Sequence, residues 1–176
     1  MIARVLSCCA CTVLACWLPH AVAREASLCR AHEQVMFHCQ IRGTPKLLSV
    51  CLATKAGAQG GDLKYRFGAA GKIELEYPTE SPEGAGTNFA AFHDSTDERR
   101  APVHVLSFTL GDNPQTATTY AVFAGQRPLG TPAPRFFGGV RVQQGAAGVT
   151  KDLVCRDAPT ERLAELKALV APAPAP

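Results

Sequence analysis

Apolar and polar residues alternate in short runs along most of the chain. Side chains on a β-strand point alternately to the two faces of a sheet, so this period of two predicts strands with one buried face. Gly, Pro, Asp and Asn separate the runs and are typical of tight turns. We therefore predict a mainly β protein, an antiparallel barrel or sandwich of about nine short strands. The predicted strands cover residues 34–41, 47–53, 62–67, 72–77, 88–92, 103–110, 116–123, 140–143 and 152–155.

The spacing changes after Asp157. Leu163, Leu166 and Val170 recur at intervals typical of one helix face, and the charged residues largely lie off that face. This predicts one C-terminal helix packed on the sheet. The alternating Ala and Pro of residues 171–176 predict an extended, disordered tail.

The hairpin over residues 62–77 has a register that its charges can select. If Phe67 pairs with Ile73, the apolar sets share one face and Arg66 lies opposite Glu74. We predict this register, with Arg66 on a solvated face of the sheet.

The start of the chain resembles an export signal. Arg4 precedes an apolar run over residues 5–18, and small residues end at Ala23, which predicts a signal peptide over residues 1–23. The run is shorter than the roughly 20 residues that a bilayer-spanning helix needs, so we expect no transmembrane helix. An alternative is a lipoprotein signal, in which Cys16 would carry a lipid anchor.

Residues 24–170 then form a single domain, long enough to bury a substantial core. Without Arg4, the 18 basic residues of the chain fall to 17, against 15 acidic residues. This balance is too even for a dedicated polyanion binder, and we expect no nucleic-acid partner.

Four cysteines remain after the predicted leader: Cys29, Cys39, Cys51 and Cys155. An even number behind an export signal predicts disulfide bonds and a location in the periplasm or outside the cell. Nearness in sequence favours a Cys39–Cys51 bond, which leaves Cys29 for Cys155. Strand alternation argues against the Cys39–Cys51 bond, because Cys39 lies on an apolar face and Cys51 points to the opposite one. Four cysteines allow three pairings, and all three stay open at this point.

The chain contains no spacing typical of a zinc site, a redox site or a nucleophile elbow. We expect no cofactor, no metal and no catalytic residues. His93, Asp94, Ser95 and Asp97 form a polar cluster, which turn chemistry explains without a ligand.

The connection over residues 125–139 is long for a compact domain, and long loops are often functional. Its prolines restrict the chain, so that Arg135, Phe136 and Phe137 form a possible contact patch for a partner. The alternative is that both rings pack onto the core.

A pattern of residues extends over most of the chain: Cys29, Val35, Phe37, Cys39, Ser49, Val50, Cys51, Tyr65, Arg66, Phe67, Gly68 and Cys155. It resembles a family of exported proteins of Gram-negative bacteria with a four-cysteine β domain. The resemblance implies export and a β domain, and it brings no activity or catalytic residues.

Three functions fit these observations. The first is a periplasmic, non-catalytic binding or inhibitor module that acts on an unknown protein or envelope partner. The second is a structural or accessory component of the cell envelope. The third is an enzyme of unfamiliar design, which would need His93, Asp94 or His104 to converge.

Overall fold

The computed structural model describes residues 27–54, 61–80, 89–94, 103–127, 132, 135–146 and 148–172. For residues 54, 91–94 and 171–172 it describes the backbone alone. The predicted signal peptide, Cys16 and residues 173–176 of the predicted tail lie outside the described part of the chain.

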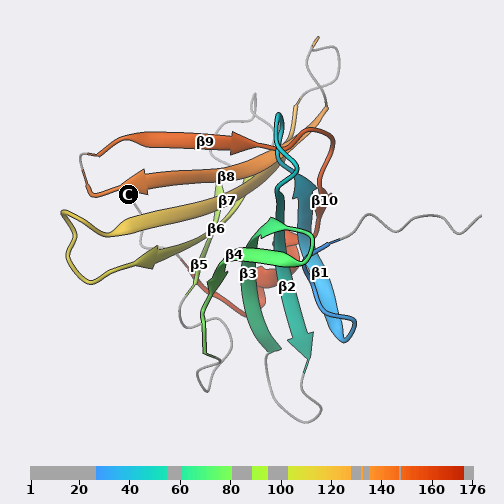
Figure 1. Cartoon of the computed structure of the whole chain (residues 1–176), viewed down its shortest axis with the longest axis horizontal. Helices are drawn as coiled ribbons and strands as arrows, with labels where there is room; N and C mark the ends of the chain where they lie inside the picture. The colour runs from blue at the N-terminus through green and yellow to red at the C-terminus, as the bar shows by residue number, and fades with distance from the viewer. Residues whose placement is uncertain are drawn as a thin grey trace, which may run out of the picture.

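The described strands form two sheets, which pack as a sandwich that is not closed into a barrel (Figure 1). The predicted mainly β fold is therefore confirmed as a sandwich. The first sheet has the order β10 (Thr160–Glu161), β1 (Glu33–Gln40), β2 (Leu47–Thr54), β3 (Gly61–Ala69), β4 (Lys72–Tyr77). The second has the order β11 (Ala171–Pro172), β5 (Ala90–Asp94), β6 (Val103–Leu110), β7 (Thr118–Gln126), β8 (Phe136–Gln144), β9 (Thr150–Val154). All neighbours are antiparallel except β11 and β5.

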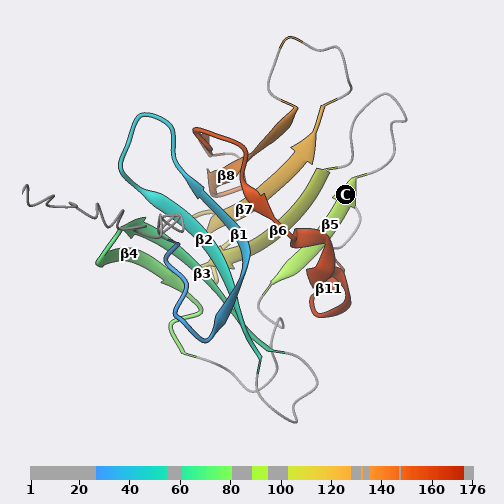
Figure 2. The same ribbon diagram turned by 90° about the vertical axis from the view of Figure 1, so that its right-hand side faces the viewer.

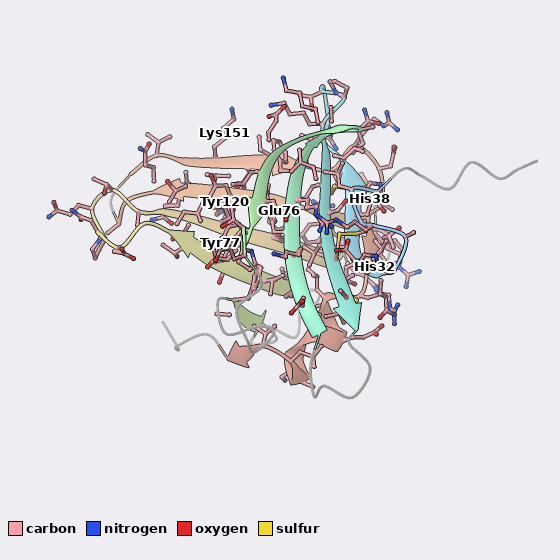
Figure 3. All side chains as sticks on the ribbon, turned by 60° about the horizontal axis from the view of Figure 1, so that its bottom comes forward. His32, His38, Glu76, Tyr77, Tyr120 and Lys151 are labelled. Carbon is pink, nitrogen blue, oxygen red and sulfur yellow. A yellow bond between two sulfur atoms is a disulfide. The ribbon has the colours of Figure 1, made fainter. Side chains whose placement is uncertain are left out.

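The core lies between the sheets and includes a cluster of stacked rings. Phe108 of β6 has its ring centroid 4.9 Å from that of Tyr65, 4.2 Å from Tyr77 and 5.0 Å from Tyr120. Figure 3 labels Tyr77 and Tyr120, which come from different sheets. Aromatic pairs at such distances stabilise a core beyond the area that they bury. The three tyrosines of the chain therefore all belong to one contact between the two layers.

The predicted C-terminal helix is a 3₁₀ helix over Leu163–Ala168, and it lies against β5 (Figure 2). Leu163, Leu166 and Val170 are buried, as their spacing predicts. Ala171 and Pro172 continue as β11 and pair with β5, so the prediction of a disordered tail is wrong for these two residues. Backbone pairing with a sheet edge holds them in place. The described residues include no helix long and apolar enough to cross a membrane.

Cys39 and Cys155 form a disulfide bond where the two sheets meet. Ile41 bridges to Cys155, and the Arg42 N–H donates to the Val154 carbonyl at 2.9 Å. Cys39 faces the core, as its alternation with Phe37 and Ile41 predicts. The bond thus ties the end of β1 to the end of β9, and closure of so long a loop contributes about 5 kcal/mol in the chain-entropy model.

Cys51 faces away from the core and bonds to Cys29. The favoured Cys39–Cys51 pairing is therefore wrong, and the objection from strand faces is correct. Cys39 and Cys51 lie on neighbouring strands but on opposite faces of the sheet, out of each other's reach. The Cys29–Cys51 bond holds the segment before β1 over the outer face of the first sheet, where the Leu28 N–H donates to Ser49 Oγ.

Arg66 is fully buried beneath that segment, although we predicted a solvated position. Its guanidinium donates to both oxygens of Glu33 at 2.5 and 2.9 Å, to Glu76 Oε2 at 2.6 Å and to the Leu28 carbonyl at 3.3 Å. Figure 3 labels Glu76. The predicted partner, Glu74, binds Lys46 instead. We call Arg66, Glu33 and Glu76 the buried arginine cluster.

A register shift at Gly68 accounts for the change of partner. The pairing moves between Phe67 and Gly68, so that Phe67 lies opposite Leu75 and not opposite the predicted Ile73. Gly68 has a φ of +151°, and a Cβ there would come 2.3 Å from the Lys72 carbonyl oxygen. Only glycine fits this bulge, since any side chain would collide with the facing backbone.

Candidate functional site

The outer face of the second sheet carries apolar side chains where a solvated sheet face normally carries polar ones. On β6, Leu106 is buried in the core, whereas Val103 and Val105 alternate with the core residues and face outward. On β7, Val122 is buried and Phe123 faces outward. Around Val105 and Phe123 this sheet is therefore apolar on both faces, whereas Thr109 and Thr119 lie further along the outer face.

The strand register aligns the outward residues into a row. Val105 lies opposite Phe123, Phe123 opposite Gly139, and Gly139 opposite Val154. The row thus crosses four adjacent strands from β6 to β9. Gly139 has no side chain, and a Cβ there would come 2.3 Å from the Leu153 carbonyl oxygen, because β9 runs close to β8. Gly139 leaves no side chain in the row between Phe123 and Val154, and the face is hollow along the other members of the row, Val105, Phe123 and Val154.

A groove of about 850 Å³ occupies this hollow. Its volume and its apolar lining with a few charged groups are typical of a site for a small molecule. The described residues that line it are Arg42, Val103, Val105, Ala121, Phe123, Arg127, Phe136, Phe137, Gly138, Arg141, Asp152, Val154, Cys155, Arg156, Asp157 and Ala158. We call this surface the arginine-lined groove.

Two of its four arginines are paired with carboxylates. Arg141 donates to both oxygens of Asp152 at 2.8 and 2.9 Å. These hydrogen bonds lower the pKa of Asp152 and raise that of Arg141, although partial burial opposes both shifts. Arg156 donates to Asp157 at 2.7 Å, and both side chains of this pair are exposed. Exposed pairs contribute at most about 1 kcal/mol, so a ligand can replace either partner.

Of the other two arginines, Arg42 forms no ion pair among those of the described residues. Arg127 lies over the ring of Phe137, with its guanidinium carbon 4.4 Å from the ring centroid. Arg42 follows β1 at the junction of the sheets, with an exposed side chain. With four arginines and two aspartates, the described lining carries two excess positive charges.

The patch predicted at Arg135, Phe136 and Phe137 lies at one end of the groove. Phe136 is 43% exposed and Phe137 is half-buried, so the alternative in which both rings pack into the core does not hold. The Arg135 guanidinium lies 5.4 Å from the centroid of Phe136, outside the groove lining. The structure therefore brings the two rings into the groove, whereas whether they contact a partner stays a prediction.

The polar cluster at His93 is only partly described. Ser95 and Asp97 lie outside the described residues, and for His93 and Asp94 only the backbone is given. The register places His93 opposite His104. His104 and Glu161 line a cavity of about 50 Å³, room for about one water molecule and too little for a substrate.

One group of possible metal ligands occurs among the described residues: Cys29, Glu33 and Cys51. The two sulfurs are bonded to each other. A disulfide offers no thiolate, and Glu33 already accepts two hydrogen bonds from Arg66 and one from the Arg30 N–H, so this group is structural.

Comparisons of the chain with models of known families, with curated proteins and with solved structures find no match. Most residues of the groove were not predicted from the sequence, although one pattern in the sequence indicates the apolar outer face. Residues 120–124 form an unbroken apolar run, which is typical of a strand covered on both faces.

Proposed function

We propose that this protein is an exported, non-catalytic binding module that holds its ligand in the arginine-lined groove. The groove is the observation that carries the proposal. An apolar sheet face costs free energy when it stays in water, at roughly 25 cal/mol for each Å² of apolar surface. A hollowed apolar face with charged edges is what a ligand site requires, and nothing in the core of the sandwich needs it.

The chemistry of the lining supports binding over catalysis. Its titratable side chains, among the described residues, are arginines and two aspartates, and Cys155 is bonded to Cys39. Arginine keeps its proton at any physiological pH, and the pKa of Asp152 lies further below neutrality than usual. A general acid or base needs a pKa near the working pH, and a covalent catalyst needs an activated nucleophile. The arginines of the lining are suited to hold an anion.

The disulfides support the export that the leader predicts. Both bonds involve only the four cysteines outside the predicted signal peptide. Such bonds persist in an oxidising compartment, which fits the periplasm or the outside of the cell. Expression of the full chain in a Gram-negative host tests this: we expect the processed, oxidised protein in the osmotic-shock fraction. Recovery of the reduced, unprocessed chain in the cytoplasm would count against export.

Binding is tested with N-phenyl-1-naphthylamine, an uncharged dye whose fluorescence rises in apolar surroundings. Ala121→Trp fills the groove from β7 with a large ring, and we expect it to reduce dye binding at least about tenfold. Ile73→Trp is the matched control, because Ile73 is exposed on the first sheet, outside the groove. Equal binding by both variants, or no binding by the wild type, would refute the groove as the site.

A further inference from the structure

We propose that the ligand of the arginine-lined groove is an anionic amphiphile with one hydrocarbon chain and one carboxylate head, as in a fatty acid. This inference rests on the proposed function and goes further by naming the chemistry of the ligand. The hydrocarbon chain of the ligand lies across β6 to β9, and its carboxylate head binds at Arg42 and Arg156.

The length and shape of the apolar floor suit an extended hydrocarbon chain. The row from Val105 through Phe123 and Gly139 to Val154 spans three inter-strand spacings, or about 14 Å at roughly 4.8 Å each. Each position of the row is a valine, a phenylalanine or a glycine, so a chain laid along it meets no polar side chain of the row. The floor ends at Val154, where the groove becomes charged.

The charge at that end is positive and available. The Arg42 backbone N–H donates to the carbonyl of Val154, which places Arg42 directly beside the end of the row. Among the described residues, no carboxylate forms an ion pair with Arg42. Arg156 follows Cys155 on the same side, and its pair with Asp157 is exposed and weak. A guanidinium binds a carboxylate through two parallel hydrogen bonds, so one head group can use either arginine or both.

The position of the groove disfavours an extended peptide as the ligand. A peptide that adds to a β-sheet takes its affinity from unpaired backbone groups at a sheet edge. β7 and β8 form the middle of the groove floor, and each already pairs with a neighbour on both sides. A peptide on this face would leave its own backbone groups without partners, at a substantial cost in free energy. A hydrocarbon chain has no such groups.

A displacement experiment tests the head group and the hydrocarbon chain of the ligand separately. The processed full-length chain, with both disulfides intact, is loaded with N-phenyl-1-naphthylamine and titrated with four competitors below their micelle concentrations. Three of the competitors have the same hydrocarbon chain and differ in the charge of the head group: dodecanoate, dodecyl maltoside and dodecyltrimethylammonium. Acetate has the carboxylate head of dodecanoate without the hydrocarbon chain. We expect dodecanoate to bind at least about tenfold more tightly than the other three, the increment of one charge-assisted contact.

Variants locate the head group. Arg42→Ala should weaken dodecanoate about tenfold and leave dodecyl maltoside unchanged, and adding Arg156→Ala should weaken dodecanoate further. Arg162→Ala is the matched control, since Arg162 pairs with Glu165 outside the groove. Equal affinity for the neutral and anionic detergents, equal binding of acetate, or an unaltered Arg42→Ala variant would overturn this inference and leave the binding function standing. Failure of every chain-bearing competitor and of the dye would overturn both.

Discussion

The buried arginine cluster makes the stability of the first sheet depend on one guanidinium. Arg66→Ala would remove every hydrogen bond that Arg66 donates and leave Glu33, whose side chain is 4% exposed, as a buried charge without its ion-pair partner. Removing one partner of a buried pair costs about 3–5 kcal/mol. A domain of this size has a total stability of about 5–15 kcal/mol, so the loss is a large part of the whole.

Urea unfolding of the oxidised, processed chain at pH 7, followed by circular dichroism, measures this loss. We expect Arg66→Ala to lower the free energy of unfolding by about 3–5 kcal/mol and the melting temperature by about 6–20 °C. Glu74→Gln is the control, because the Lys46–Glu74 pair is exposed on both sides and should contribute less than about 1 kcal/mol.

A double-mutant cycle separates the ion pair from other effects of truncation. If the pair carries the energy, Arg66→Ala combined with Glu33→Ala should cost at least about 1 kcal/mol less than the two single costs added together. Strict additivity, or a loss for Arg66→Ala no larger than that for Glu74→Gln, would refute the assignment of a buried, coupled pair.

Three further predictions follow from the fold. Burial alone would raise the pKa of Glu33, but hydrogen bonds from Arg66 and from the Arg30 N–H, together with the charge of Arg66, lower it below the ordinary 4.5. The folded state therefore binds fewer protons than the unfolded state. The stability from Glu33 is present above about pH 4.5 and is lost as the pH falls through the folded pKa, so Glu33→Gln should flatten this decline in acid urea titrations. Replacing Cys39 and Cys155 with serine should cost about 5 kcal/mol, against about 3 kcal/mol for Cys29 and Cys51, in the same urea assay; equal losses would contradict the loop-length argument. Gly68→Ala should lower stability by more than about 1 kcal/mol, because of its φ and the facing backbone, and a neutral result in thermal melts would show that the bulge relaxes.

The sequence predicted the strands well because each apolar alternation is a local signal. Strand β8 shows the limit of a local signal. The predicted strand began at Val140, whereas the observed strand begins at Phe136. The predicted connection over residues 125–139 included Gly138 and Gly139, but they lie within the strand and allow close approach of the neighbouring backbone. Whether a glycine lies in a connection or within a strand depends here on β9, which follows later in the sequence.

Arg66 was predicted on a solvated face and is buried, for a similar reason. Its alternation with Tyr65 and Phe67 correctly assigned it to the outer face of the sheet. That face is covered only because the Cys29–Cys51 bond folds an earlier segment over it. The groove was not predicted, and of its residues the sequence indicated only Phe136 and Phe137, as part of a contact patch. Arg42 and Arg156 reach the groove because the two sheets meet there, which no local pattern records.

Amide NMR spectra of the isotope-labelled, processed chain, titrated with dodecanoate, show whether the outer face of the second sheet binds an amphiphile. We predict the largest shift changes at Arg42, Val105, Phe123 and Val154, the residues along the groove. Changes confined to the strands of the first sheet, or no changes at millimolar dodecanoate, would contradict binding at this face.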